Sequence, residues 1–162
     1  MKRVIAAAIV WPNALFIFGL LWLKIAPDME QWLAPVLKDQ QIEAVERVDD
    51  TVCWSWKWRK THDAIPAGSA WSFVLLGTSV DYPAIVQRRQ DGGVVSQPRN
   101  RNPGPGSSEF CADIPRTLAN VTNLRIEGSL AYTPSHKLWL VWQDVPPVIV
   151  PPRSVTSEPT KQ

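Results

Sequence analysis

The sequence predicts an all-β fold, namely a single antiparallel β-sandwich preceded by one N-terminal transmembrane helix. Three observations predict it: an apolar run over residues 4–23, alternating apolar and polar residues in several later segments, and turn-forming residues between those segments. Of the 162 residues, about 110 remain once the apolar run and a proline-rich end are removed. That length suits one hydrophobic core rather than two.

Residues 1–24 form the predicted membrane anchor. Lys2 and Arg3 precede an almost uninterrupted apolar run from Val4 to Leu23, in which Asn13 is the only polar residue. A helix of about 20 residues, rising 1.5 Å per residue, just crosses the roughly 30 Å of hydrocarbon in a bilayer. A buried core helix would show polar residues at every third or fourth position, and a cleavable signal peptide has an apolar centre of only about 7–15 residues. We therefore expect an uncleaved anchor, with a cleaved signal peptide as the alternative.

The anchor has an internal interruption and a predicted direction. Pro12 removes one helical hydrogen bond, so it indicates at least a kink, and Asn13 is a candidate for association with a partner helix through its amide. A simple kink in a lone anchor is the plainer interpretation. Because Lys2 and Arg3 precede the run, the positive-inside rule places the N-terminus in the cytoplasm and the rest of the chain outside the cytosol.

The two cysteines, Cys53 and Cys111, both lie in the predicted external part. In an oxidising compartment such a pair predicts a disulfide, which stabilises by about 4 kcal/mol on the chain-entropy estimate. Two free buried thiols are the alternative. A zinc site is not expected, because the cysteines and the histidines His62 and His136 show none of the paired spacings typical of metal ligands.

The remaining chain divides into three parts by composition. Residues 25–40 are expected to form a juxtamembrane stem in which Met29, Trp32 and Leu33 share one side of a short helix, at the membrane surface or against the base of the domain. Residues 41–145 form the predicted extracytosolic sandwich. Residues 146–162 begin with doubled prolines and end in polar residues, which is typical of an edge segment followed by a flexible tail.

Strands are predicted where apolar residues alternate with polar ones. A long loop is expected over residues 97–108, which contain three prolines and two glycines. Short strands with turn signals every 8–12 residues are typical of immunoglobulin-like and fibronectin-like sandwiches, with a small barrel as the alternative. The predicted strands are residues 42–48, 51–59, 70–78, 84–88, 94–96, 110–114, 124–132 and 138–142.

The segment 51–59 raises the main question about binding. Trp54, Trp56 and Trp58 fall on one face of this strand by period-two alternation, while Lys57 and Arg59 fall on the other. Three flat apolar rings could form an exposed ligand platform for sugars or bases. Because the opposite face is charged, we expect the tryptophan face to pack in the core, and the platform is the alternative.

Catalytic signatures are missing from the sequence. It contains no G-x-S-x-G elbow, no phosphate-binding glycine loop and no H-E-x-x-H motif, so we expect no enzymatic function, no cofactor and no metal. Outside residues 1–24 the chain has 14 basic and 15 acidic residues, a net charge of −1, which gives no reason to expect nucleic acid as a partner.

The sequence thus favours a non-catalytic function at a membrane. We expect a structural or protein-interaction component of a bacterial envelope, or a phage-encoded one, with the lipid bilayer and an unidentified protein as partners and loops such as Gln97–Ser108 presented to that protein. A carbohydrate-binding envelope module using Trp54, Trp56 and Trp58 is the alternative, and an envelope enzyme is the third.

Overall fold

The computed structural model describes residues 2–78, 80–95 and 101–153, and it describes side chains from residue 11 onward. The chain divides into two compact units, Met1–Pro35 and Val36–Gln162.

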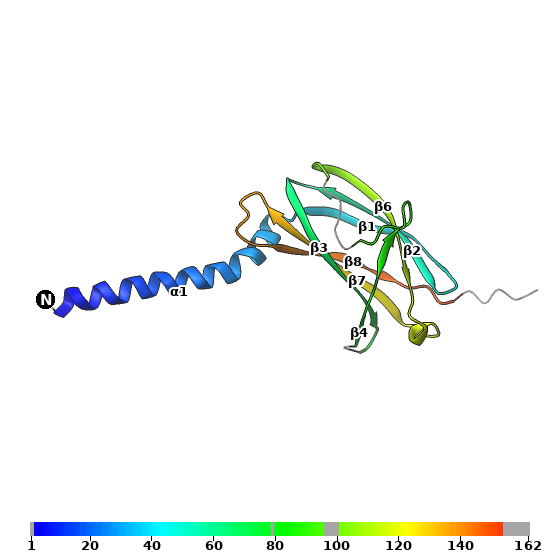
Figure 1. Ribbon diagram of the computed structural model, residues 1–162, viewed down its shortest axis with the longest axis horizontal. Helices are drawn as coiled ribbons and strands as arrows, with labels where there is room; N and C mark the ends of the chain where they lie inside the picture. Colours follow the sequence, from blue (N-terminus) through cyan, green and yellow to red (C-terminus); the bar gives the residue numbers. More distant parts are fainter. Residues whose placement is uncertain (1, 79, 96–100, 154–162) are drawn as a thin grey trace, which may run out of the picture. The chain divides into compact units, whose positions relative to one another are not determined.

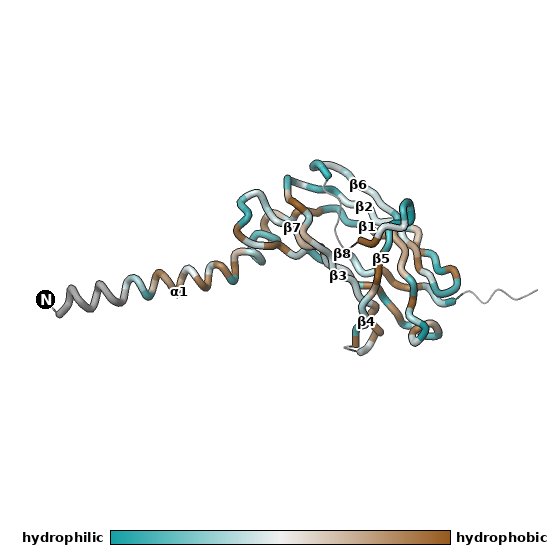
Figure 2. The backbone as a smooth tube through the Cα atoms, viewed as in Figure 1, coloured by the Kyte–Doolittle hydropathy of each residue, from teal (hydrophilic) through white to brown (hydrophobic). Residues whose placement is uncertain are grey.

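The first unit contains one helix, α1 (Lys2–Leu33), which runs through Pro12 and Pro27. The first part of the predicted stem is therefore not a separate element, because residues 25–33 continue α1. Most of the residues that follow Pro27 are good helix formers, so the one hydrogen bond lost at this proline does not end the helix. Figure 2 shows hydrophobic residues recurring along the described part of α1. Among the described residues, we find no helix that combines the length and the apolar character needed to cross a membrane.

The second unit is built from two four-stranded sheets in which every pair of neighbouring strands is antiparallel (Figure 1). The arrangement is consistent with a β-sandwich. A short 3₁₀ helix, Arg116–Leu118, lies between β6 (Gly104–Asp113) and β7 (Leu124–Pro134). The first sheet has the order β1-β2-β6-β5, formed by Leu37–Val48, Thr51–Lys60, Gly104–Asp113 and Val86–Arg88. The second has the order β4-β3-β7-β8, formed by Asp81–Pro83, Ala64–Leu75, Leu124–Pro134 and Val141–Ile149.

Buried side chains from both sheets form one hydrophobic core. The alternation predicted for β7 is confirmed over its first half, because Leu124, Ile126 and Leu130 are buried while Arg125 and residues 127–129 are half-buried. Fully burying a large apolar side chain is worth about 1.5–3 kcal/mol, so this alternation fixes which face of the strand points inward.

One buried side chain ties the edges of the two sheets together. The amide of Gln143, in β8, accepts a hydrogen bond from the Leu37 N–H at 2.8 Å and donates one to the Leu37 carbonyl. Both backbone groups of the first residue of β1 are thereby satisfied, although β1 and β8 belong to different sheets. The start of β8 therefore lies beside the start of β1.

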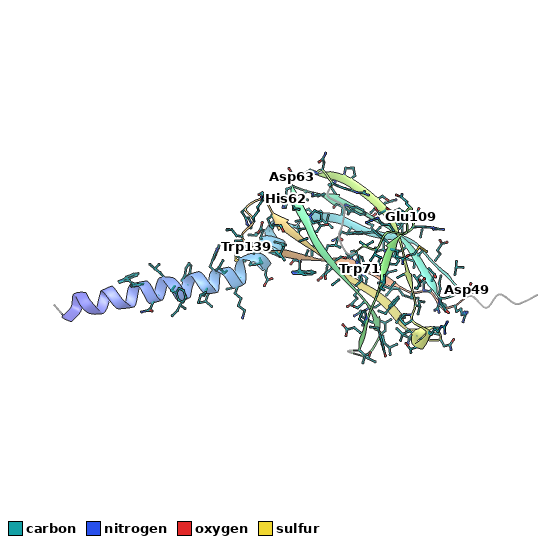
Figure 3. The ribbon with its side chains drawn as sticks, viewed as in Figure 1. Asp49, His62, Asp63, Trp71, Glu109 and Trp139 are labelled. Atoms are coloured by element: carbon teal, nitrogen blue, oxygen red, sulfur yellow. A yellow bond between two sulfur atoms is a disulfide. The ribbon has the colours of Figure 1, made fainter. Side chains whose placement is uncertain are left out.

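The strand register defines two ends of the β-rich unit. At one end β1, β3 and β8 begin, while β2 and β7 finish. We name this the entry end, because the chain enters the unit there at Val36. Figure 3 shows His62, Asp63 and Trp139 toward this end and Asp49 toward the opposite one.

Several predicted boundaries are wrong at prolines and glycines. Residues 65–68 lie before the predicted strand 70–78 but belong to β3, which shifts register between Pro66 and Gly68. Pro146 and Pro147 belong to β8, so the predicted tail begins inside a strand and the final strand covers Val141–Ile149 rather than residues 138–142. Proline fits these places because β8 is an edge strand and because a bulge leaves one donor unpaired.

Two other strand boundaries differ from the prediction. Gly104–Ser108, predicted as loop, form the first half of β6, and β1 begins at Leu37 within the predicted stem rather than at residue 42. Of the predicted strands 84–88 and 94–96, the described residues form the short β5 and a single bridge between Gln87 and Val94. Residues 97–100 of the predicted loop and 154–162 of the predicted tail lie outside the described residues.

Candidate functional site

Cys53 and Cys111 are joined in a disulfide between two neighbouring strands of one sheet. They lie directly opposite each other in the β2–β6 register, and both are half-buried. Their neighbours Val52 and Trp54 point into the core, so period-two alternation places the disulfide on the outer face of the sheet. The bond therefore locks a strand pair and does not cross the core.

The three predicted platform residues divide into two buried rings and one partly exposed ring. Trp54 and Trp56 are 1% and 3% exposed, whereas Trp58 is half-buried. The ring of Trp54 lies 6.0 Å from those of Trp71 and Phe110, and the ring of Trp56 lies 4.4 Å from that of Trp58. Trp54 and Trp56 are thus core residues, and a surface platform made of all three rings is not present in this structure.

Each of two tryptophans lies over a glycine on the neighbouring strand. Trp71 faces Gly128 across β3 and β7, and Trp58 faces Gly106 across β2 and β6. A Cβ atom added at either glycine would lie under 3.0 Å from three atoms of the facing indole. These glycines leave room for the rings, and an isolated glycine inside a strand is the sequence signal that indicates such a close approach.

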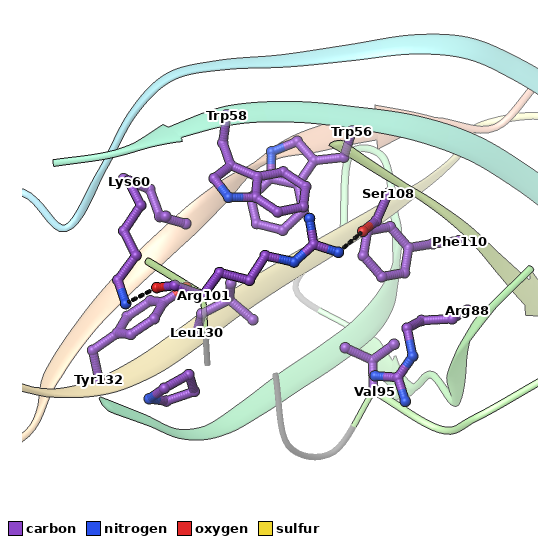
Figure 4. Close-up of a pocket in the computed structure, with 12 residues that line it drawn as sticks. Trp56, Trp58, Lys60, Arg88, Val95, Arg101, Ser108, Phe110, Leu130 and Tyr132 are labelled. Atoms are coloured by element: carbon purple, nitrogen blue, oxygen red, sulfur yellow. Dashed lines mark hydrogen bonds between the residues drawn. The ribbon is translucent and has the colours of Figure 1, made fainter. Parts of the chain in front are cut away.

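A small cavity lies in the β-rich unit, with an aromatic wall (Figure 4). Its volume is about 60 Å³, which is enough for ordered water. The lining includes Trp56, Trp58, Phe110 and Tyr132, together with the cations Lys60, Arg88 and Arg101.

Lys60 has a structural role. The Lys60 ammonium donates hydrogen bonds to the carbonyl oxygens of Ala64, at 2.8 Å, and Arg101, at 2.6 Å. Burial lowers the pKa of Lys60, and the nearby Asp63 carboxylate opposes that shift. This side chain joins the start of β3 to the segment that precedes β6.

Arg101 and Tyr132 complete the cavity wall. The Arg101 guanidinium lies 5.3 Å from the centre of the Trp58 ring and donates to the Ser107 carbonyl and the Ser108 hydroxyl.

Burial raises the pKa of Tyr132 to about 12, so its phenol is neutral at physiological pH. Its contribution to stability is fully present below pH 10 and is lost as the pH rises toward 12.

A second hollow, of about 670 Å³, is lined by residues of β3, β4, β7 and β8. Small residues such as Ala70, Ser72 and Ser129 line it together with three carboxylates, and no basic residue does. The carboxylates belong to Asp81, Glu127 and Asp144, and that of Glu127 pairs with Arg125. Within the described parts of the chain, no group of three or more His, Cys, Asp or Glu residues is placed to hold a metal ion.

The remaining predicted site residue, Asn13, has an exposed side chain on α1, and its role in helix association stays a prediction. No protein-family model matches the chain, and no curated protein is similar to it.

Proposed function

We propose that this chain is a single-pass membrane protein whose N-terminal helix anchors a non-catalytic, extracytosolic binding or structural domain. The observation that carries the proposal is the exposure of large apolar side chains on α1. Four consecutive residues, Leu15, Phe16, Ile17 and Phe18, are each 57–67% exposed. Successive helical residues point about 100° apart, so these side chains face every direction. Such a helix is stabilised by a hydrocarbon environment, because transfer of each large side chain from water is worth about 1.5–3 kcal/mol.

Charge and cysteine chemistry support the orientation. Lys2 and Arg3 precede the apolar run, which favours a cytoplasmic N-terminus. The Cys53–Cys111 disulfide belongs to the second unit, and disulfides persist in oxidising compartments such as the bacterial periplasm or the cell surface. We accordingly propose a bacterial envelope, or a phage-encoded protein directed to it, as the setting.

We also propose that the second unit is an immunoglobulin-like or fibronectin-like sandwich. If its strands are lettered A, B, C, C′, D, E, F and G in chain order, the two sheets read A-B-E-D and C′-C-F-G. Immunoglobulin domains have this order. Their disulfide joins strands B and F across the core, whereas here the bond joins B to E within one sheet.

The proposed binding role belongs to the outer surface of this sandwich. Trp54 and Trp56 are buried in the core and cannot contact a ligand. A partner would therefore contact the outward faces of the two sheets. Asp81, Glu127 and Asp144 give the 670 Å³ hollow an acidic lining, which favours a partner surface with positive charge.

Substitution of Leu15 tests the anchor. The full chain is expected to stay in the membrane pellet after alkaline carbonate extraction, and Leu15→Arg is expected to shift it to the supernatant. An arginine near the centre of a span costs about 2.5–3.5 kcal/mol of insertion. The matched control is Val48→Arg, which changes an exposed apolar residue outside α1 and should remain in the pellet.

The proposal fails if the unsubstituted chain is extracted by carbonate. It also fails if intact mass measurement shows that the apolar run has been removed, because the segment would then be a cleaved signal peptide.

A further inference from the structure

The connection between β7 and β8 exposes large apolar side chains at the entry end. Leu138 is 69% exposed, Leu140 is 45% exposed and Trp142 is 47% exposed. Trp139, between them, is half-buried. We name Leu138, Trp139, Leu140 and Trp142 the apolar tip.

Local hydrogen bonds give the apolar tip a defined shape. The Lys137 N–H donates to the Pro134 carbonyl at 3.0 Å, which closes a turn with Lys137 in the left-handed region at a φ of 57°. The Leu138 N–H donates to His136 Nδ1 at 3.1 Å, and the His136 ring lies 4.5 Å from the ring of Trp139. The backbone is therefore held while Leu138 and Leu140 remain in contact with solvent.

The tip lies at the end of the unit where the N-terminal tether enters. β8 begins immediately after Leu140, and Gln143 holds its start against Leu37. Only residues 34–36 separate the last residue of α1 from the first of β1. If α1 is a membrane anchor, the entry end is the end of the unit that is tethered near the bilayer. The inference below rests on that proposed function.

The entry end has a small excess of basic side chains. Lys38, Arg59 and Lys137 are exposed there together with Asp39 and Asp63. Arg59 pairs with Asp39 at 3.4 Å, and Asp63 lies near the Lys60 ammonium, so Lys38 and Lys137 are available to an anionic surface. Basic side chains near an anionic leaflet are attracted to it.

The segment of α1 that precedes the unit has a matching apolar side. Ile25, Met29, Trp32 and Leu33 are spaced at i, i+4, i+7 and i+8, and their exposed fractions are 49%, 41%, 81% and 63%. This spacing places them on one side of α1, where they directly follow the apolar run and meet the headgroup region as the helix leaves the bilayer. The chain therefore approaches β1 through a segment suited to the membrane surface.

We propose that the apolar tip inserts into the headgroup region of an anionic bilayer and forms a second membrane contact beside the anchor. Tryptophan prefers this region because its ring is apolar while its N–H is polar. The contact holds the entry end against the membrane and directs the opposite end, with Asp49, away from it.

Fluorescence quenching by brominated lipids tests this contact in the full chain. The chain is reconstituted in vesicles of phosphatidylcholine and phosphatidylglycerol, with bromine placed either near the headgroup or near the chain terminus. The difference between the fluorescence of the unsubstituted chain and that of the Trp139→Phe/Trp142→Phe variant reports the two tip indoles. We expect this difference to lose most of its intensity with bromine near the headgroup and little with deep bromine. Equal intensity in brominated and unbrominated vesicles would overturn the proposal and would mean that water or a protein covers the tip.

The same samples separate this inference from the proposed anchor. In the double variant seven tryptophans remain; Trp11, Trp22 and Trp32 lie on α1, and the other four belong to the β-rich unit. Quenching of the remaining fluorescence therefore reports α1. An inserted anchor with unquenched tip indoles refutes only the tip contact, whereas the absence of any quenching refutes both.

A charged substitution with a matched control completes the test. Leu138→Asp should abolish the quenching of the tip indoles. Val80→Asp should leave it unchanged, because Val80 is 49% exposed in the β3–β4 connection at the opposite end. If both variants behave like the unsubstituted chain, the tip does not insert.

Discussion

Replacement of both cysteines by alanine is expected to lower the free energy of unfolding by about 4 kcal/mol. The disulfide joins residues separated by 58 positions, so its removal returns a large loop-closure entropy to the unfolded chain. It also releases the cross-strand pair that fixes the β2–β6 register. Denaturant unfolding of the full chain in detergent measures the change, and reduction of the unsubstituted protein should reproduce it.

The matched control is the next outward-facing pair of the same two strands. Ser55 lies opposite Glu109, two residues from the disulfide on each strand, and both side chains are on the outer face. Ser55→Ala/Glu109→Ala should change stability by less than about 0.5 kcal/mol. If the cysteine and control double variants unfold at the same denaturant concentration, the disulfide does not stabilise the fold as argued.

Gly128→Ala is expected to destabilise the protein by about 3 kcal/mol. The added methyl group would overlap the Trp71 ring. Trp71 cannot move freely, because its ring also packs against Trp54 at 6.0 Å and Phe110 at 6.4 Å. The strain therefore spreads into the aromatic core. Thermal or denaturant unfolding measures the loss.

Two further variants show whether the overlap with Trp71 is the cause. In a Trp71→Leu background, Gly128→Ala should cost much less, so the double-mutant cycle should show a coupling energy above about 1 kcal/mol. Gly106→Ala creates the same overlap with Trp58. Both rings are half-buried, but Trp71 is held between two rings whereas Trp58 contacts the Trp56 ring and the flexible Arg101 side chain, so a loss near 1 kcal/mol is expected. Strict additivity in the cycle would contradict the explanation.

The β-rich architecture follows from period-two alternation, which is strong in β2 and β7. Trp54 and Trp56 are buried as the pattern predicts, and so are Leu124 and Ile126. The alternation carries this information because burial on one face of a strand fixes every second residue. The cysteine pair could be predicted from composition, yet its position within one sheet depends on a strand register that no local pattern encodes.

The strand boundaries that were predicted wrongly lie at residues whose local backbone preference differs from the conformation they have in the sheet. Pro66 is expected before the strand 70–78 and Pro147 in the proline-rich edge segment and tail, but a register shift and an edge position make both compatible with strands. Gly106 reads as loop, although it is the residue that accommodates the Trp58 ring. In each case the deciding contact is made by a strand distant in sequence.

The hydrogen bonds that link distant parts of the chain could not be predicted from the sequence either. Gln143 and Leu37 are 106 residues apart, and the bond from Lys60 to the Arg101 carbonyl spans 41 residues. Neither pair has a sequence signature. The apolar tip was also not predicted as a surface, because Leu138–Trp142 reads equally well as a buried strand.

The most direct test of the account is the side of the membrane on which Lys57 lies. Its side chain is 54% exposed on β2, whereas Lys2 precedes the apolar run. We expect a membrane-impermeant amine reagent applied to sealed bacterial spheroplasts expressing the full chain to modify Lys57, and Lys2 to react only after detergent is added. Modification of Lys2 in sealed spheroplasts with Lys57 protected, or protection of both until lysis, would contradict it.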